Sequence, residues 1–502
     1  MANAKTRWGA LVLGVAAASA AVGTLRAAST PPVSADPMDA KTQMFLSQCR
    51  AEFNQVDASI EKAGTRFREY HLVPGFPYMR SDRLLASFGD QVGNSDVLDA
   101  WTLELRDNDG FAREIELANM GMPRQQRAAL LNDLRLCAVW LSNIELTNRA
   151  TLDRLVQAAR PPEKAPRDAA VTAKLDSETA RRQALLKADF ERPLAQLGGD
   201  SQLVQWQAKK AADDSAVPTD WSRAVHDGLG RVGLTPDSWR ALAERNAPRW
   251  LIETSGAYDT LGTPVMGKDG VQVDTSHATV YYQAGYARIN GRAAIQMDYF
   301  VWFSARHGVG ASDADAGPLD GLIWRVTLDA EGKPAFYDAI HMSGFDQMWF
   351  MPASFVQKPA APDEDPVLVA QRVVPTLAPS VRLHTGSHTP RRVLAASEAG
   401  APATKEYDLV EYEYLMTLPT EGGGTRSVFD AQGVVPGTER ANALYQSTGV
   451  PHAGALRVWG THPTSLAARH FFDDPYLVDK LFILAGKNNS AADGHMRLAG
   501  RP

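Results

Sequence analysis

The spacing of apolar residues changes once along this chain, near residue 250, and this change limits the folds open to it. Before residue 250, apolar side chains recur every three or four residues, as in Phe45, Cys49, Phe53 and Val56, which is the spacing of amphipathic helices. After residue 250, apolar and polar residues alternate, as they do from Leu322 to Asp329, which favours half-buried strands. The pattern predicts an α+β protein, with an N-terminal all-helical domain at 41–248 and a β-rich, mostly antiparallel C-terminal domain at 249–502.

Individual elements follow from the same periodicities. Asn290-Gly291 favours a two-residue turn between two strands within 278–306, and a second hairpin is expected from Leu322 to His341. Residues 71–80 contain Pro74, Gly75 and Pro77, so an ordered aromatic loop or a lid is expected there. The remaining helices are expected at 81–90, 94–118, 150–160, 175–197, 235–246 and 473–482, and the remaining strands at 379–384, 405–418, 425–429 and 454–460.

The N-terminal segment has the composition of an export signal. Lys5 and Arg7 precede an uncharged, mostly apolar run from Trp8 to Leu25, as in a signal peptide or a signal anchor. Residues 1–26 are therefore expected to direct export, whether cleaved or retained in the membrane, and 27–40 are expected to form a flexible tether. The protein is predicted to be extracytoplasmic (periplasmic, secreted or anchored through 8–25), with membrane contact only through this segment.

Charge and cysteine content narrow the function further. The chain has 52 Lys and Arg against 58 Asp and Glu, a net charge of -6 without a block of like charge, which argues against nucleic-acid binding. Its two cysteines, Cys49 and Cys137, either form a disulfide in an oxidising compartment or are two separate core residues. The sequence GLGRVG at 228–233 follows a helical pattern instead of a strand, so we expect no nucleotide cofactor.

Histidines in loops of the β-rich half are the candidate site. Several follow the ends of predicted strands, where side chains leave the core, and three or four imidazole or carboxylate ligands suffice for a transition metal, most simply zinc. In this interpretation Asp346 takes a proton from the metal-bound water, and Arg306 or Arg457 stabilises an oxyanion. The proposed metal ligands are His341, His384, His388, His462 and His470. The alternative is that these histidines bind loop backbone and no metal.

Two acidic patterns accompany the histidines. The loop at 311–321 carries Asp313, Asp315 and Asp320 but lacks the glutamate of a calcium-binding EF-hand loop. Its carboxylates are expected either to be solvated or to orient the histidines. Glu411 and Glu413 are expected on one strand face, roughly 6.6 Å apart, a spacing near that of inverting glycoside hydrolases.

The function best supported by the sequence is a metal-dependent, zinc-like hydrolase of the cell envelope. Its ligand would be a small molecule or an envelope polymer. The first alternative is a non-catalytic envelope binding or assembly protein, and the second is a glycoside hydrolase that uses the carboxylate pair.

Overall fold

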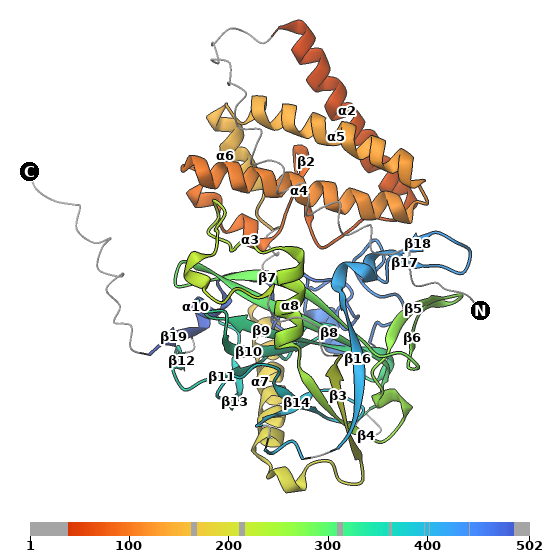
Figure 1. Cartoon of the computed structure of the whole chain (residues 1–502), viewed down its shortest axis with the longest axis vertical. Helices are drawn as coiled ribbons and strands as arrows, with labels where there is room; N and C mark the ends of the chain where they lie inside the picture. Colours follow the sequence, from red (N-terminus) through yellow and green to blue (C-terminus); the bar gives the residue numbers. More distant parts are fainter. Residues whose placement is uncertain are drawn as a thin grey trace, which may run out of the picture.

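The computed structural model of this chain describes residues 39–485 except 162–167, 210–215, 309–314, 360, 362–363, 396, 401 and 441. The expected export segment at 1–26, the tether as far as residue 38, and Asp313 lie outside the described residues. Among the helices of the described residues, none is both long enough and apolar enough to cross a membrane. The fold class is α+β, with helices first and a large, mostly antiparallel sheet after them (Figure 1).

A bundle of helices forms the upper part of the molecule in Figure 1. Side-chain caps start three of its helices: Asp39 before α2, Asn94 before α4 and Asn148 before α6 each accept a backbone N–H of the first turn. The apolar faces of these helices meet in one core that contains Phe53, Trp101 and Leu141. The bundle consists of α2 (Ala40–Ala63), α4 (Ser95–Asn119), α5 (Arg124–Glu145) and α6 (Arg149–Ala158).

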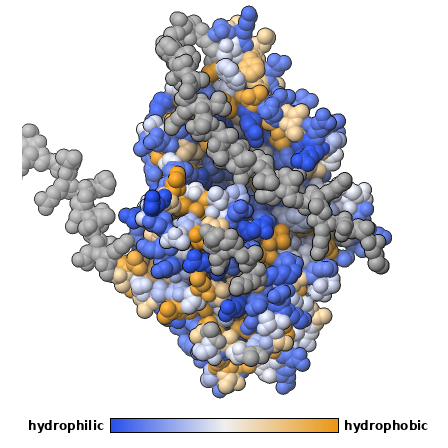
Figure 2. Space-filling view, in the orientation of Figure 1, coloured by the Kyte–Doolittle hydropathy of each residue, from blue (hydrophilic) through white to orange (hydrophobic). Residues whose placement is uncertain are grey.

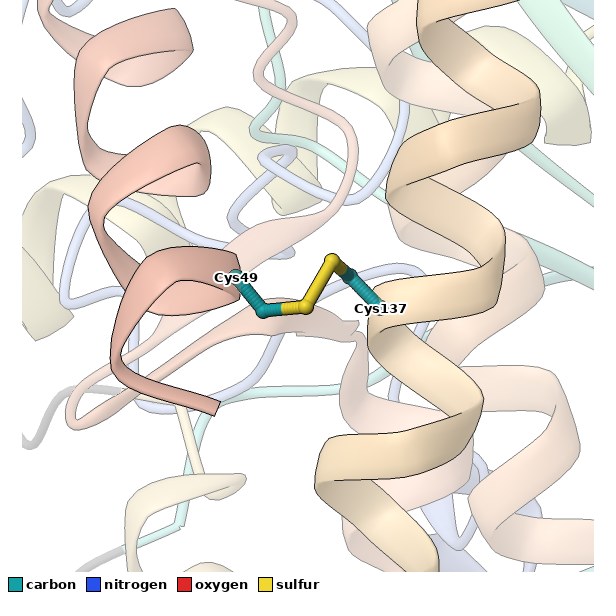
Figure 3. Close-up of a disulfide and its surroundings, with 2 residues drawn as sticks. All are labelled: Cys49 and Cys137. Carbon is teal, nitrogen blue, oxygen red and sulfur yellow. A yellow bond between two sulfur atoms is a disulfide. The ribbon is translucent and has the colours of Figure 1, made fainter. Parts of the chain in front are cut away.

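A disulfide between Cys49 of α2 and Cys137 of α5 joins two helices of the bundle (Figure 3). Their Cα atoms lie 5.3 Å apart, within the range that a disulfide spans. Of the two alternatives that the sequence left open, the structure therefore has the disulfide.

Removing this disulfide by the double change Cys49→Ala and Cys137→Ala is expected to lower the free energy of unfolding by about 4 kcal/mol. The bond links residues 88 positions apart, and opening so long a loop increases the conformational entropy of the unfolded chain. Urea unfolding of the oxidised protein and of the double variant, followed by circular dichroism, measures the difference. A change below about 1 kcal/mol would contradict the expectation.

The expected aromatic loop at 71–80 is instead a hairpin of β1 (His71–Val73) and β2 (Phe76–Ser81). Gly75 has a φ of 84°, which only glycine adopts easily. The residues that led to the prediction of a loop therefore form the turn of this hairpin. Arg80 of β2 makes buried ion pairs with Asp109 and Glu116 of α4, which attaches the hairpin to the bundle.

The second part of the molecule is an 11-stranded sheet among the described residues. Both hairpins predicted from the sequence are confirmed: β7 joins β8 through Asn290 and Gly291, which have φ of 50° and 74°, and β9 pairs with β10. In spatial order the strands are β13 (Leu368–Arg372), β11 (Met348–Met351), β10 (Pro334–His341), β9 (Gly317–Leu328), β8 (Arg292–Arg306), β7 (Thr279–Ile289), β16 (Ala403–Glu411), β3 (Gln202–Ala208), β4 (Arg249–Thr254), β14 (Ser380–Leu383) and β15 (Pro390–Leu394).

Three elements before residue 249 belong to the sheet and not to the helical bundle. Strand β3 lies between β16 and β4 in the sheet, although it falls within the segment 41–248 that was expected to be all-helical. Helices α7 (Ala169–Glu191) and α8 (Pro236–Asn246) pack on the sheet through Phe190 and Leu242. A seven-residue strand isolated between helices gives too short a period-2 pattern to be recognised from the sequence.

The sheet is covered on both faces, which explains the apolar runs on both sides of its central strands. One face, with Tyr299 and Trp324, packs against α7 and α8. The opposite face, with Phe300 and Ile323, packs against α4 of the helical bundle and against the loops that follow β16. The helical bundle therefore lies over one face of the sheet, and α7 lies against the other.

Some strand predictions after residue 400 were wrong. Strand β16 ends at Glu411, and residues 412–417 form a 3-10 helix, so Glu411 and Glu413 do not share a strand face. Residues 454–460 make a single isolated bridge, between Arg457 and Val434. The short elements are α3 (Arg83–Ala86), α9 (Ala443–Ser447), α10 (Leu477–Leu481), and the strand pairs β5 (Thr263–Gly267) with β6 (Gly270–Asp274), β12 (Phe355–Gln357) with β19 (Phe482–Leu484), and β17 (Leu418–Pro419) with β18 (Thr425–Arg426).

Candidate functional site

A cavity of about 200 Å³ lies between α7 and one rim of the sheet. Strands β8 and β10 both run antiparallel to β9, so their C-terminal ends and the start of β9 meet at this rim. The turn between β14 and β15 reaches the same place, because the N–H of His307 donates to the carbonyl of Gly386 at 3.0 Å. The polar side chains that line the cavity are Arg182, Arg306, Asp315, His341, Ser343, Asp346, Ser387, His388, Thr389, Arg440 and Tyr445.

Asp320 of β9 is the centre of a buried hydrogen-bond network beside this cavity. Its side chain is fully buried, and its two carboxylate oxygens accept from His341 Nε2 at 2.5 Å and from His388 Nδ1 at 2.6 Å. Burial alone would raise the pKa of Asp320, but the attraction and hydrogen bond of His341, together with those of His388, hold it far below its usual value. Asp320 is therefore a carboxylate at neutral pH, and it orients both imidazoles.

His341 connects Asp320 to a serine hydroxyl. Its Nδ1 faces both the backbone N–H of Ser343, at 3.1 Å, and the Oγ of Ser343, at 2.7 Å. Because Nδ1 receives the backbone N–H, it is an acceptor, and the ring proton belongs on Nε2, where Asp320 accepts it. The resulting chain, Ser343 Oγ–H to His341 to Asp320, has the nucleophile–base–carboxylate order of a serine hydrolase.

A tight turn after β10 makes this arrangement. The N–H of Gly344 donates to the carbonyl of His341 at 2.8 Å, which folds Ser343 back over the imidazole. Gly344 has a φ of 87°, and a Cβ there would lie 2.5 Å from the Cδ of Pro463, so this position requires glycine. The side chain of His341 is 23% exposed and lines the cavity, so the base is accessible to a small substrate.

His388 is held between two carboxylates. Its Nδ1 donates to Asp320, its Nε2 lies 3.3 Å from Asp259 Oδ1, and its ring stacks on Phe303 with centroids 3.6 Å apart. Burial lowers the pKa of His388, but the hydrogen bonds to Asp259 and Asp320 outweigh burial and raise it. Its φ of 51° is unusual for a residue other than glycine. His388 thus lies between Asp320 and Asp259, and it contacts the Asp320 oxygen that His341 does not.

The other charged groups of the cavity include an arginine that has no carboxylate partner among the described residues. Arg440 donates to the carbonyls of Pro318 and Leu319, at 3.0 and 2.8 Å. Arg182 instead pairs with Asp346, and with Asp315 at 3.4 Å. The third arginine, Arg306, donates to the carbonyl of Ser387 at 2.9 Å. The guanidinium of Arg440 is thus held at the cavity by carbonyl oxygens, and Asp346, the predicted base, is in an ion pair.

The other predicted site residues do not line the cavity. The ring of His384 contacts the carbonyl of Thr385, and His470 pairs with Glu364 and lies 3.7 Å from Asp474. Neither ring nitrogen of His462 has a hydrogen-bond partner in the described part of the chain. Burial holds the pKa of His462 well below its usual value. Arg457 donates to the carbonyls of Pro451, His452 and Thr461, and burial lowers its pKa to about 10.

The structure brings two of the five predicted metal ligands together, His341 and His388. All four ring nitrogens of these two residues face a carboxylate or the N–H and hydroxyl of Ser343. Across the described ranges, no group of three or more His, Cys, Asp or Glu side chains is arranged to hold a metal ion.

Two residues of the network were missed as site residues by the sequence reasoning. Ser343 follows His341 by two residues and precedes Gly344, a pattern that indicates a tight turn after a strand. The sequence does not show that this turn brings the hydroxyl of Ser343 to the imidazole of His341. Asp259, which also accepts the N–H of Gly386 at 2.6 Å, ends the 3-10 helix Ala257–Asp259, far before His388 in the sequence, and no local pattern marks it. Of the two alternatives given for the acidic loop, solvated carboxylates or carboxylates that orient histidines, Asp320 follows the second.

No protein-family model, curated protein sequence or solved structure matches this chain.

Proposed function

We propose that this protein is a hydrolase that cleaves small ester or amide substrates with Ser343 as nucleophile. The observation that carries the proposal is the hydrogen-bond chain from Ser343 through His341 to the buried carboxylate of Asp320. A serine hydroxyl is a weak nucleophile unless a base takes its proton, and a carboxylate behind the base stabilises the imidazolium that forms.

Each step of the reaction uses a group already in place. The Oγ of Ser343 attacks the substrate carbonyl while its proton passes to His341 Nδ1, and Asp320 stabilises the resulting cation through Nε2. The proton then goes to the leaving group, whose bond to the carbonyl carbon breaks, and an ester to Ser343 remains. Water, deprotonated by His341, hydrolyses this ester and restores the serine.

The charge of the cavity indicates the class of substrate. The guanidinium of Arg440 lines it and makes no ion pair with a carboxylate among the described residues, and Arg306 lines the same space. Arginines favour carboxylate or phosphate groups, which they bind with two parallel hydrogen bonds. We therefore infer a small anionic substrate whose charged group Arg440 binds.

A zinc-dependent hydrolase is the second candidate. It is favoured by the convergence of His341, His388 and Asp320, which are zinc ligands by type. A metal there would have to displace the hydrogen bonds that now occupy both ring nitrogens of His341 and Nδ1 of His388. The metal content after purification without a histidine tag separates the candidates, and less than about a tenth of an equivalent of any transition metal would remove the zinc proposal.

The protein is proposed to act outside the cytoplasm. The N-terminal sequence supports this location, and so does the disulfide between Cys49 and Cys137, since disulfides persist mainly in oxidising compartments. The ligand is proposed to be a small molecule or a fragment of an envelope polymer that can enter a cavity of about 200 Å³.

The substitution Ser343→Ala tests the proposal directly. Hydrolysis of p-nitrophenyl acetate and of the anionic p-nitrophenyl hemisuccinate is followed for the wild type and the variant, with and without a chelator. The variant is expected to lose at least about 100-fold in rate, and the wild type is expected to prefer the anionic ester and to tolerate the chelator.

The matched control is Ser387→Ala, a serine that lines the same cavity from the β14–β15 turn, and its rate is expected to stay within about twofold of the wild type. Full activity of Ser343→Ala would contradict the proposal. If that activity were lost with chelator and restored by zinc, the second candidate would replace it.

A further inference from the structure

The outer surface of the helical bundle carries a row of exposed apolar side chains, which we call the α2–α5 ridge. On α2 the exposed fractions are 67% for Met44 and 41% for Phe45. On α5 they are 54% for Leu136, 37% for Val139 and 52% for Trp140. Single exposed apolar residues are ordinary on protein surfaces, but a cluster that includes a half-exposed tryptophan marks an interaction site.

The ridge is one continuous and rigid surface. Phe45 and Trp140 contact each other edge to face, with ring centroids 6.0 Å apart. The disulfide lies one helical turn away from both, because Cys49 follows Phe45 by four positions and Cys137 precedes Trp140 by three. The two helices therefore hold the ridge side chains in a fixed arrangement.

The middle of the ridge face of α5 has no charged residue. Leu136, Val139 and Trp140 lie at i, i+3 and i+4 and share one face of the helix. The residues that the helical rotation places within about 40° of Leu136 are uncharged, namely Gln125, Ala129, Asn132, Trp140 and Asn143. Asp133 lies at the edge of this face. A surface that bound an acidic or basic protein would carry charges in its middle, so the composition fits an apolar partner.

The ridge lies at the end of the bundle that is farthest from the sheet. Figure 1 shows α2 and α5 at the top of the molecule, and Figure 2 shows orange side chains among blue ones over the same region. The cavity lies beside α7, which packs on the opposite face of the sheet from the bundle. A planar partner could therefore cover the ridge without covering the cavity.

The sequence that precedes α2 indicates the kind of partner. The uncharged run from Trp8 to Leu25 ends 15 residues before Ala40, the first residue of α2, and Met44 and Phe45 belong to the first two turns of that helix. The root-mean-square span of a random-coil chain of this length is about 20 Å. A membrane that holds the apolar run would thus lie within reach of the ridge.

We propose that the α2–α5 ridge rests on the surface of a lipid bilayer, on which the apolar run Trp8–Leu25 of the same chain anchors it. Trp140 and Phe45 are of the residue types that favour the interface between lipid headgroups and acyl chains. The ridge alone offers a small apolar area, and the anchor raises its local concentration at the membrane. This proposal is independent of the hydrolase proposal.

The test measures how far lipids reach Trp140 in the full chain. The protein is reconstituted into phosphatidylcholine vesicles with and without brominated acyl chains, which quench tryptophan fluorescence on contact. The chain has 11 tryptophans, so the wild type is expected to lose more emission than Trp140→Phe, by about one eleventh of the total. The contribution of Trp8 in the anchor is the same in both proteins and cancels.

Trp239→Phe is the matched control, because Trp239 lies on α8 against the sheet, and its quenching is expected to equal that of the wild type. Leu136→Glu places a charge on the ridge, which should keep Trp140 out of contact with the lipid. The loss of emission in Leu136→Glu is therefore expected to equal that in Trp140→Phe. Equal quenching in wild type and Trp140→Phe would overturn the proposal. So would protection of Trp140 together with cross-linked dimers in the vesicles, which would assign the ridge to a second copy of the chain.

Discussion

His341→Gln is expected to lower the rate of ester hydrolysis by about 10²–10⁴-fold, the range that a positioned general base contributes. Glutamine keeps a polar side chain of similar length, but it cannot take the proton of Ser343. The loss should appear mainly in kcat, since the hydrogen bond from Ser343 contributes as the proton moves. Steady-state kinetics on the anionic p-nitrophenyl ester measures the change.

His384→Gln is the matched control for this measurement. His384 was predicted as a metal ligand beside His341, but its ring faces the backbone of its own turn, and it does not line the cavity. Its substitution is expected to leave kcat within about twofold. A rate loss in His384→Gln equal to that in His341→Gln would contradict the site as described and would favour the metal cluster predicted from the sequence.

Asp320→Asn is expected to lower the free energy of unfolding at pH 7 by about 3–5 kcal/mol, the cost of removing one charge from a buried ion pair. His388 would remain beside Asp259 without its nearer carboxylate partner, and His341 would lose the carboxylate that accepts its Nε2 proton. Urea unfolding of both proteins measures the difference. Asp408→Asn is the control, since Asp408 is 55% exposed in its pair with Lys209, and such pairs contribute about 0–1 kcal/mol.

The same substitution has a defined pH dependence. The folded protein holds the pKa of Asp320 far below the ordinary value of 3.8. The stability that Asp320 contributes is therefore fully present above a pH of about 4 and declines as the pH falls below it. The difference between wild type and Asp320→Asn should narrow as the pH falls below about 4, where Asp320 becomes protonated in the unfolded chain. A difference that widened below about pH 4 would contradict the assignment of Asp320 as the ionised member of the network.

Local patterns predicted the parts of the fold that local chemistry decides. The turn at Asn290-Gly291 needs two residues with positive φ, and these residue types supply them wherever they stand between strands. Helix α8 begins at the cap of Thr235 with Pro236 in the first turn, as its sequence indicates. For the acidic loop before β9, the sequence left two alternatives open, solvated carboxylates or carboxylates that orient histidines, and Asp320 has the second role.

The parts of the fold and of the site that were not predicted depend on contacts between residues far apart in the sequence. Strand β3 pairs on one side with β4, the next strand in the sequence. Its other partner, β16, comes about 200 residues later. The five candidate histidines were chosen because they follow strand ends, but strand ends lie at several rims. His341 and His388 meet at Asp320, whereas the ring nitrogens of His462 have no hydrogen-bond partner in the described part of the chain and His470 pairs with Glu364. Which histidines meet depends on the strand order, which no local pattern contains.

Covalent trapping of the serine tests directly whether Ser343 is an activated nucleophile. The wild type is incubated with a fluorophosphonate, which forms a stable adduct only with an activated serine, and the labelled residue is located by mass spectrometry of the peptides. We predict one adduct per chain, on Ser343, that is lost in Ser343→Ala, slowed in His341→Gln and retained in Ser387→Ala. No adduct, or an adduct on a residue other than Ser343, would contradict the account.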